Sequence, residues 1–248
     1  MNVLPVASSS SGNCTMIYND DTHILIDCGV ATKKVLEITG RDTFDALFIS
    51  HDHGDHMSSA GPLGRKTKVP IYVHPAIQKA KEVQFKNCTL IDMDETKTFN
   101  IGSLVITPFS TKHDAIHSVG FIIDEPSTKT KLCYLTDTGN ISKTMRAHMI
   151  ECNAFFIEAD YDDELILAYE EYDQLLKDRI MSDFGHLSTN QMIEFLSSLD
   201  LNAVKVIIVG HLSARTNSPE KLKERIHEKL ASFESKILVA PFTSYITI

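Results

Sequence analysis

The sequence predicts an α/β (α+β) protein in which two β-sheets carry helices on their outer faces. Short apolar and β-branched runs fill the first half, whereas strand and helix patterns alternate in the second half. Runs of this length, bounded by turn residues, are typical of strands. The stretch SSSSGN, residues 8–13, predicts a turn. The predicted strands are Met16–Tyr18, His23–Asp27, Ala46–Ile49, Ile71–Val73, Leu104–Phe109, Val119–Ile123, Leu132–Leu135, Ala154–Ile157 and Val204–Val209.

Two of the predicted helices have start signals in the sequence. Ser188 is followed three residues later by Gln191, which is the pattern of a capping box. Ser218 precedes Pro219, and proline is favoured at the first helical position. A Gly-His-Leu-Ser stretch lies upstream of both helices, so a histidine precedes each of them. The predicted helices are Glu171–Met181, Thr189–Ser198 and Pro219–Leu230.

Length and composition are those of one globular unit. The 248 residues, 43% of them hydrophobic, suffice for one large core, and we expect a single domain over residues 1–248. Without a run of about 18 apolar residues, no membrane-spanning helix is expected. The N-terminal stretch does not resemble a signal peptide. The five cysteines are scattered and never spaced as C-x-x-C, which predicts free thiols in a reducing cytoplasm.

The net charge of −9 does not indicate a general affinity for nucleic acid. Such binding depends mainly on phosphate contacts to Lys and Arg. A local basic strip would suffice, and GRKTK, residues 64–68, is one candidate, although a solvated loop is the simpler interpretation. Charge alone therefore leaves nucleic-acid binding open, and the sequence does not predict an oligomeric state.

The stretch LFISHDHGDHM, residues 47–57, carries the strongest chemical signal. An apolar run is followed within six positions by three histidines and two aspartates. His51 and His53 point the same way on an extended segment, because side chains alternate, and can bind one metal. Asp55 and His56 follow on a turn and can face a neighbouring metal. These nitrogen and oxygen donors suit Zn²⁺, with Mn²⁺ or iron as alternatives.

This motif resembles the H-x-H-x-D-H signature of the metallo-β-lactamase superfamily, and further landmarks follow that family's order. LIDCG (residues 25–29) resembles its early strand end, and STKHDA (residues 110–115) supplies a later histidine. YLTDTG (residues 134–139) resembles its strand-end aspartate, and VGHLS (residues 209–213) its last histidine. The resemblance spans nearly the whole chain. It implies an αββα sandwich of two mixed β-sheets flanked by helices, with metals at one edge of both sheets.

The resemblance also implies a dinuclear centre. Two neighbouring cations joined by a carboxylate and a bridging hydroxide generate a nucleophile near neutral pH. Asp27 is expected either to orient ligands through hydrogen bonds or to close the corner after its strand. The implied ligands are His51, His53 and His113 for the first metal, Asp55, His56 and His211 for the second, and Asp137 for both.

Two further stretches resemble the phosphodiesterase branch of the superfamily. FFIEADYD (residues 155–162) and GHLST (residues 185–189) are similar to paired motifs of the transfer-RNA 3′-processing ribonuclease. In that enzyme a glutamate and a histidine act together to protonate the leaving oxygen. Glu158 and His186 are the matching positions, so the implied catalytic residues are Asp55, Glu158 and His186.

Within the superfamily, the chain resembles in particular the bacterial WalJ/YycJ-like group, which is regarded as DNA exonuclease-like. The shared stretches are ASSSSGNC, SHDHGDH, HDAxxxVGF, TDTG, EADYD and LLKDRIMSDFGHLS. The group usually carries an Asn-Asn pair after His-Leu-Ser, whereas Thr216 and Asn217 stand here. Around this stretch the resemblance implies substrate binding by Ser213, Arg215 and Asn217.

The implied activity is that of a dinuclear metal-dependent phosphodiesterase that acts on DNA. A metal-bridging hydroxide is expected to attack phosphorus while His186, aligned by Glu158, protonates the departing oxygen. Hydrolysis of a small substrate, such as a cyclic phosphodiester or a lactone, is the alternative, because the fold alone does not decide. A metal-binding regulator without catalysis is a third interpretation.

Because the chain is acidic overall, contacts to DNA are expected to depend on a few basic residues. Those next to the motifs are Arg65, Lys66, Lys68 and Arg215. The other histidines lack a partner at ligand spacing in the sequence and are expected to be structural or surface residues. They are His23, His74, His117, His148 and His227, of which His117 lies only four residues after His113.

Overall fold

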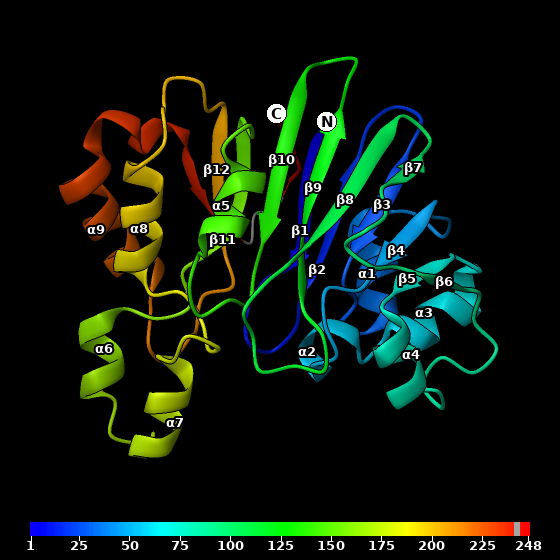
Figure 1. Cartoon of the computed structure of the whole chain (residues 1–248), viewed down its shortest axis with the longest axis horizontal. Helices are drawn as coiled ribbons and strands as arrows, with labels where there is room; N and C mark the ends of the chain where they lie inside the picture. Colours follow the sequence, from blue (N-terminus) through cyan, green and yellow to red (C-terminus); the bar gives the residue numbers. More distant parts are fainter. Residues whose placement is uncertain (241–243) are drawn as a thin grey trace.

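In the computed structural model, which describes residues 1–240 and 244–248, two seven-stranded β-sheets pack face to face (Figure 1). The predicted sandwich of two mixed sheets is confirmed. In spatial order, the first sheet contains β14 (Ile246–Thr247), β1 (Asn2–Ala7), β2 (Cys14–Tyr18), β3 (His23–Ile26), β4 (Ala46–Phe48), β5 (Ile71–Val73) and β6 (Leu90–Asp92). The second contains β13 (Ile237–Val239), β12 (Val206–Gly210), β11 (Ala154–Glu158), β10 (Thr130–Leu135), β9 (Val119–Glu125), β8 (Leu104–Ser110) and β7 (Phe99–Ile101).

Each sheet joins an antiparallel half to a parallel half. In the first sheet β1, β2 and β3 pair antiparallel, and β3 to β6 pair parallel. In the second sheet β7 to β10 pair antiparallel, and β10 to β13 pair parallel. The parallel strands of each sheet therefore end at a common edge, where the segments that follow them come together.

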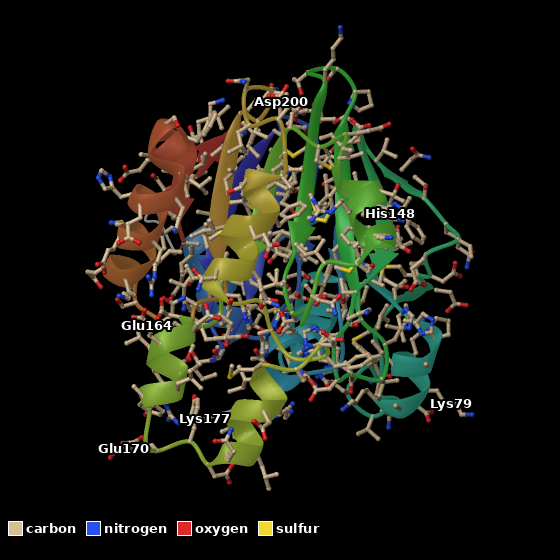
Figure 2. All side chains as sticks on the ribbon, turned by 60° about the vertical axis from the view of Figure 1, so that its left-hand side comes forward. Lys79, His148, Glu164, Glu170, Lys177 and Asp200 are labelled. Carbon is tan, nitrogen blue, oxygen red and sulfur yellow. The ribbon has the colours of Figure 1, made fainter. Side chains whose placement is uncertain are left out.

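Helices cover the outer face of each sheet, with α8 and α9 at the left of Figure 1 and α3 and α4 at the right. Next to the first sheet lie α1 (Thr32–Thr39), α2 (Gly54–Met57), α3 (Ala60–Thr67) and α4 (Pro75–Ala80). Next to the second lie α5 (Lys143–Met149), α8 (Thr189–Ser197), α9 (Pro219–Leu230) and the 3₁₀ helix η1 (Ala231–Lys236). A projecting segment contains α6 (Asp163–Ala168) and α7 (Gln174–Ile180), and Figure 2 shows Glu170 and Lys177 on it.

Three apolar layers hold the two sheets and their two outer sets of helices together. The middle layer lies between the sheets and includes Ile24, Phe48, Phe121 and Phe156. A second layer lies between the second sheet and its helices, and a third between the first sheet and its helices. The inner strands β4, β11 and β12 of the parallel halves are buried on both faces, which explains why they read as continuous apolar runs rather than alternating ones.

The predicted helix starts at Ser188 and Ser218 are confirmed. The Ser188 side chain accepts a hydrogen bond from Gln191 N, and the Gln191 side chain accepts one from Ser188 N, as in a capping box. Ser218 accepts a hydrogen bond from Lys221 N, with Pro219 at the start of α9. The predicted helix over residues 171–181 instead begins at Gln174, because the Asp173 carboxylate caps it by accepting a hydrogen bond from Leu176 N.

No described helix is long and apolar enough to cross a membrane. The five cysteines are all free in the structure, as predicted, and four of them are buried.

Candidate metal centre

The predicted site residues converge at the edge where the parallel strands end. His51 to His56 follow β4, Asp137 follows β10, Glu158 ends β11 and His211 follows β12. The short helix α2 presents Asp55 and His56, where a turn was expected. Gly29 makes room for this helix, because a Cβ at that position would lie 1.6 Å from Asp55 O. The close approach therefore requires the glycine of the LIDCG stretch.

One group of potential ligands contains His51, His53 and His113, all with ligand atoms within 4.8 Å of one another. His113 Nε2 lies 3.1 Å from His53 Nδ1. The other ring nitrogen of His113, Nδ1, donates a hydrogen bond to Gly185 O at 2.9 Å. A ring held in this way presents its remaining nitrogen to the cluster.

A second group contains Asp55, His56 and His211, and Asp137 lies beside both groups. His56 Nε2 lies 3.2 Å from Asp137 Oδ2 and 3.4 Å from Asp55 Oδ2. Asp137 Oδ1 lies 3.5 Å from His211 Nε2 and 3.8 Å from His113 Nε2. The two oxygens of Asp137 therefore face different histidines.

Three buried imidazole nitrogens indicate that the cluster is built for cations. His51 Nε2 and both ring nitrogens of His211 are buried and have no hydrogen-bond partner of acceptable geometry among the described residues. A buried polar atom without a partner costs about 1–3 kcal/mol, so such atoms are uncommon unless something else binds them. Imidazole nitrogens and carboxylate oxygens form a donor set that suits divalent metals. The residues therefore fit the metal ions that the fold implies.

A layer of hydrogen bonds orients the ligands. Asp27 Oδ2 lies 2.7 Å from His56 Nδ1 and accepts from Ser50 Oγ at 2.8 Å. Asp27 Oδ1 accepts from Ser50 N at 2.8 Å, which also closes the corner after β3. The two roles expected for Asp27 are therefore compatible. Ser50 Oγ also lies 3.0 Å from His51 Nδ1.

Glu158 is fully buried and contacts two histidines at once. Its Oε2 lies 3.1 Å from His186 Nδ1 and 3.3 Å from His211 Nδ1. Its Oε1 accepts hydrogen bonds from Thr138 N at 2.8 Å and Leu187 N at 3.2 Å. The sequence suggested the pairing with His186 but not the contact with His211. Both rings are thereby turned so that Nε2 faces away from Glu158.

The electrostatics differ between the two halves of the cluster. Burial lowers the pKa of His51 well below its usual value, with a further decrease from His56. Burial alone would also lower the pKa of His56, but Asp137 and Asp27 outweigh it and raise that pKa to about 10. For Asp137 burial opposes ionisation, yet the neighbouring His211 and His56 hold its pKa well below the usual value. The Asp137 carboxylate is therefore ionised and attracts positive charge.

His186 is positively charged at neutral pH in this environment. Burial would lower its pKa, but the hydrogen bond and the charge of Glu158 raise the pKa to about 9. For Glu158 burial would raise the pKa, but the hydrogen bonds to His186 and His211 lower it to about 2. The pair is thus a carboxylate beside a protonated imidazole.

Three residues of the centre hold backbone conformations that favour glycine. Asp27, Asp137 and His211 have φ values of 61°, 57° and 50°. Non-glycine residues with positive φ are uncommon and are enriched at functional sites, where the surroundings enforce them. Asp27 and His211 directly follow a strand, and Asp137 lies two residues after the end of β10, so each strained corner turns a side chain into the centre.

A cavity of about 350 Å³ lies beside the centre and is lined by Ser9, Ser10, Ser11, Tyr172, Ser213, Ala214 and Arg215. Arg215 is exposed, and its guanidinium lies over the Tyr172 ring, 6.0 Å from the ring centroid. Ser213 is buried, and its Oγ accepts hydrogen bonds from Arg215 N and Thr216 N. Ser10 Oγ lies 3.5 Å from Asp160 Oδ1, which in turn lies 3.8 Å from His211 Nδ1 of the centre.

Asn217 does not reach this cavity. It is buried, and its Nδ2 donates to Ala159 O at 2.7 Å and to Thr189 Oγ1 at 3.1 Å. Its Oδ1 accepts a hydrogen bond from Ser218 N at 2.8 Å. The side-chain amide therefore binds protein, and it ties the segment after β11 to the start of α8.

Arg65 is half-buried and its guanidinium binds protein. Its Nη1 donates to Gln84 O at 3.0 Å and to Lys86 O at 3.2 Å. These bonds fasten the loop after α4 to α3. Lys66 and Lys68 remain exposed.

Two residues of the centre escaped the sequence interpretation. Asn13 Nδ2 lies 2.9 Å from His56 Nε2 and 3.3 Å from Asp55 Oδ2. Asp160 is buried 3.8 Å from His211 Nδ1, and burial raises its pKa. Both lie in stretches quoted above, SSSSGN and FFIEADYD, but a single Asn or Asp in a turn has many structural uses.

Comparison with known proteins agrees with this geometry. Residues 22–211 match the family described as Beta-lactamase superfamily domain. Exodeoxyribonuclease WalJ of Streptococcus pneumoniae is 33% identical over 229 residues, which cover 87% of this chain and 82% of the relative. Exodeoxyribonuclease YycJ of Bacillus anthracis is 28% identical over 236 residues, which cover 91% and 87%.

Solved structures share the whole fold. The metallo-β-lactamase fold protein YhfI from Bacillus subtilis superposes with a TM-score of 0.77 at 18% identity, over 99% of both chains. Zn²⁺-bound PqqB from Methylobacterium extorquens has a TM-score of 0.77 at 14% identity, over 100% of both chains. The chain therefore belongs to the β-lactamase superfamily, as a metal-dependent hydrolase with the metallo-β-lactamase fold.

Proposed function

We propose that this chain is a dinuclear metal-dependent phosphodiesterase that hydrolyses DNA from an end. The observation that carries the proposal is the Glu158–His186 pair, held beside two groups of metal ligands. The names of the two exodeoxyribonuclease relatives support DNA as the substrate. Glu158 and His186 supply what a phosphodiester needs in addition to metals, which is a proton for a poor leaving group.

The proposed ligands follow the two groups in the structure. His51, His53 and His113 would hold the first metal, and Asp55, His56 and His211 the second, with Asp137 between them. Zn²⁺ is the proposed ion, because five of the seven donors are imidazoles, whereas Mn²⁺ favours oxygen-rich sites. When bound, the two ions would supply Lewis acidity that activates water and offsets charge on the phosphoryl oxygens.

His186 is proposed as the general acid. Its Nδ1 contacts Glu158, so its Nε2 is free to face the leaving oxygen, and its side chain is 20% exposed. Its raised pKa of about 9 keeps it protonated at neutral pH, as a proton donor requires. Glu158 both keeps this proton in place and fixes the ring. It also orients His211 through Nδ1, which leaves His211 Nε2 for the metal.

The cavity beside the centre is the proposed contact for the end of the DNA strand. Three serines and the exposed Arg215 line it, and hydroxyl groups and a guanidinium are suited to phosphate oxygens. Arg215 is the one basic residue among the lining residues. Contact with a single additional phosphate, rather than with a long stretch of backbone, agrees with the acidic net charge of the chain.

The test is a substrate comparison with zinc- or manganese-reconstituted protein. Duplex DNA, single-stranded DNA and RNA labelled at either end would be incubated beside bis-p-nitrophenyl phosphate, with Asp137→Asn as the inactive control. We expect mononucleotides to be released progressively from one DNA end. Brisk turnover of the small ester with no cleavage of any nucleic acid would contradict the proposal and favour the small-substrate alternative.

A further inference from the structure

A second cluster of potential metal ligands lies apart from the centre described above. It consists of His74, Glu95 and His117, whose ligand atoms all lie within 4.8 Å of one another. His74 follows β5 and caps α4, Glu95 lies between β6 and β7, and His117 lies between β8 and β9. Three segments distant in sequence therefore bring two imidazoles and a carboxylate together, and none of these residues belongs to the main centre.

The contact between His117 and Glu95 is not an ordinary hydrogen bond. His117 Nε2 lies 2.9 Å from Glu95 Oε1. This nitrogen is nevertheless buried without a hydrogen-bond partner of acceptable geometry among the described residues. Ser110 Oγ donates to the same carboxylate oxygen and holds it in place. The ring nitrogen and the carboxylate thus lie close together without being aimed at each other, as two ligands of one ion do.

The protonation states also suit a cation. Burial lowers the pKa of His74, and the adjacent His117 lowers it further, so the His74 ring is neutral at neutral pH. Burial would raise the pKa of Glu95, but the hydrogen bond from Ser110 and the neighbouring groups lower it. A neutral imidazole and an ionised carboxylate are the forms that bind metals.

Binding requires two small adjustments. The His74 and His117 rings are stacked, with centroids 3.7 Å apart and 15° between their planes, so they must tilt before both can point at one ion. His74 Nδ1 accepts a hydrogen bond from Ala76 N at 3.2 Å, and this contact must be given up if Nε2 binds the metal. All three side chains are partly exposed, which leaves room for these motions.

We propose that His74, Glu95 and His117 form a mononuclear site for a divalent transition metal of the zinc class. Two imidazole nitrogens and one carboxylate oxygen, with water in the fourth position, are a coordination that Zn²⁺ accepts. Such an ion would fasten the loop over residues 111–118 to the ends of β5 and β6. The same loop carries His113, so the site would brace one side of the main centre. This proposal does not depend on the phosphodiesterase activity.

The experiment measures zinc stoichiometry by equilibrium dialysis against buffered zinc. Wild type would be compared with His117→Gln and Glu95→Gln, and a thermal melt without added zinc would verify that each variant folds. His227→Gln is the matched control, because His227 Nδ1 lies 3.0 Å from Glu234 Oε2 with no third ligand group beside it among the described residues. We expect His117→Gln and Glu95→Gln to bind one equivalent fewer than wild type and the control to match wild type.

A cobalt titration separates this site from the main centre. Co²⁺ absorbs visible light in tetrahedral nitrogen and oxygen sites, so an Asp137→Asn variant should retain the absorption that depends on His117. Combining Asp137→Asn with His117→Gln should remove that absorption. Equal zinc stoichiometry in wild type and His117→Gln would overturn the proposal, whatever the nuclease assay gives. Loss of the His117-dependent absorption in Asp137→Asn alone would also overturn it as a separate site.

Discussion

Asp137 is the residue on which the dinuclear arrangement depends. Its two oxygens face different histidines, and it lies in a strained corner after β10. We predict that Asp137→Asn loses much of the affinity for both metals, because an amide is a weak ligand and the substitution removes the one negative charge that lies beside both groups of ligands. Elemental analysis of protein purified without chelator should show up to two equivalents at the main centre of the wild type and far less in the variant.

The control for this substitution is Asp42→Asn, on the exposed loop after α1. It should retain the wild-type metal content. Retention of both ions by Asp137→Asn would instead show that this carboxylate is not shared between them.

The proposed role of His186 as general acid predicts a loss of rate that depends on the leaving group of the substrate. A general acid matters most when the leaving group is poor. His186→Ala should therefore slow DNA cleavage by roughly 10²–10⁴-fold. It should slow hydrolysis of p-nitrophenyl esters far less, because p-nitrophenolate departs without a proton. Initial rates on both substrates, together with the metal content, measure the effect.

His227→Ala, on the exposed face of α9, is the matched histidine control and should change neither rate. Loss of a metal from His186→Ala would identify His186 as a ligand, since it also lies within ligand distance of Asp137 and His211. A Glu158→Gln variant should weaken proton donation and, because Glu158 Oε2 also contacts His211 Nδ1, should lower metal affinity as well.

The sequence and its resemblance to a family together indicated every residue of the two ligand groups, but not what surrounds them. The H-x-H-x-D-H motif is specific because its spacing fits metal geometry. Asn13 and Asp160 carry no such spacing, and only the fold brings Asn13 to His56. The assignment of Asn217 to substrate binding took no account of burial, which commits its amide to Ala159 and Thr189.

At the scale of elements, the loop that joins β12 to α9 combines a metal ligand with a basic side chain. His211 points into the centre, whereas Arg215 is exposed at the cavity. We predict that Arg215→Glu weakens turnover of DNA, mainly through a higher KM, and leaves hydrolysis of a small phosphodiester almost unchanged. Only the polymer has a phosphate beyond the scissile one for this residue to contact.

Arg41 is also exposed and lines a different cavity, so Arg41→Glu should leave both reactions unchanged. Arg65→Glu should behave differently from the expectation based on sequence. Arg65 donates hydrogen bonds to Gln84 O and Lys86 O, so reversal of its charge should lower the melting temperature of the protein. It should not weaken DNA turnover selectively. If Arg215→Glu lowers turnover of DNA and of the small phosphodiester equally, Arg215 contributes to folding or to the chemical step instead.

Elements with strong local signals were predicted well, and those that depend on tertiary contacts were not. Pro219–Leu230 and Ile71–Val73 have the predicted bounds, because a proline start or a bounded apolar run defines them locally. The strand β6 contains only half-buried and exposed residues, and α2 is a single turn held by its neighbours. Neither has a periodic apolar pattern long enough to be recognised.

For the whole molecule, the order of strands determines which sequence motifs become neighbours. Parallel pairing of β3 with β4, of β10 with β11 and of β11 with β12 brings strand-end residues to one edge of the sandwich. These residues are Asp27, His51, Asp137, Glu158 and His211. The resemblance to a family supplied that arrangement in advance. The cluster of His74, Glu95 and His117 could not be predicted from the sequence. Its residues share no motif and meet only through the packing of three loops.

Metal binding should also stabilise the whole fold. Each site draws ligands from several strands and loops, so an unfolded chain cannot reproduce it. At about 100 times its dissociation constant, one bound ion adds about 2.7 kcal/mol, or roughly 5–10 °C in melting temperature for a chain of this size. We predict a drop of at least this size when a chelator removes metal at about pH 8.

The stabilisation should shrink as the pH falls. A metal binds only the deprotonated ligand, and Asp137 and Asp27 overcome burial to raise the pKa of His56 to about 10 in the metal-free chain. A proton therefore competes with metal at His56 across the neutral range, and competition increases toward acid. The difference in melting temperature between loaded and chelated protein should be smaller at about pH 6 than at about pH 8. A difference that grows toward acid, or no difference at either pH, would contradict the coupling of this centre to the fold.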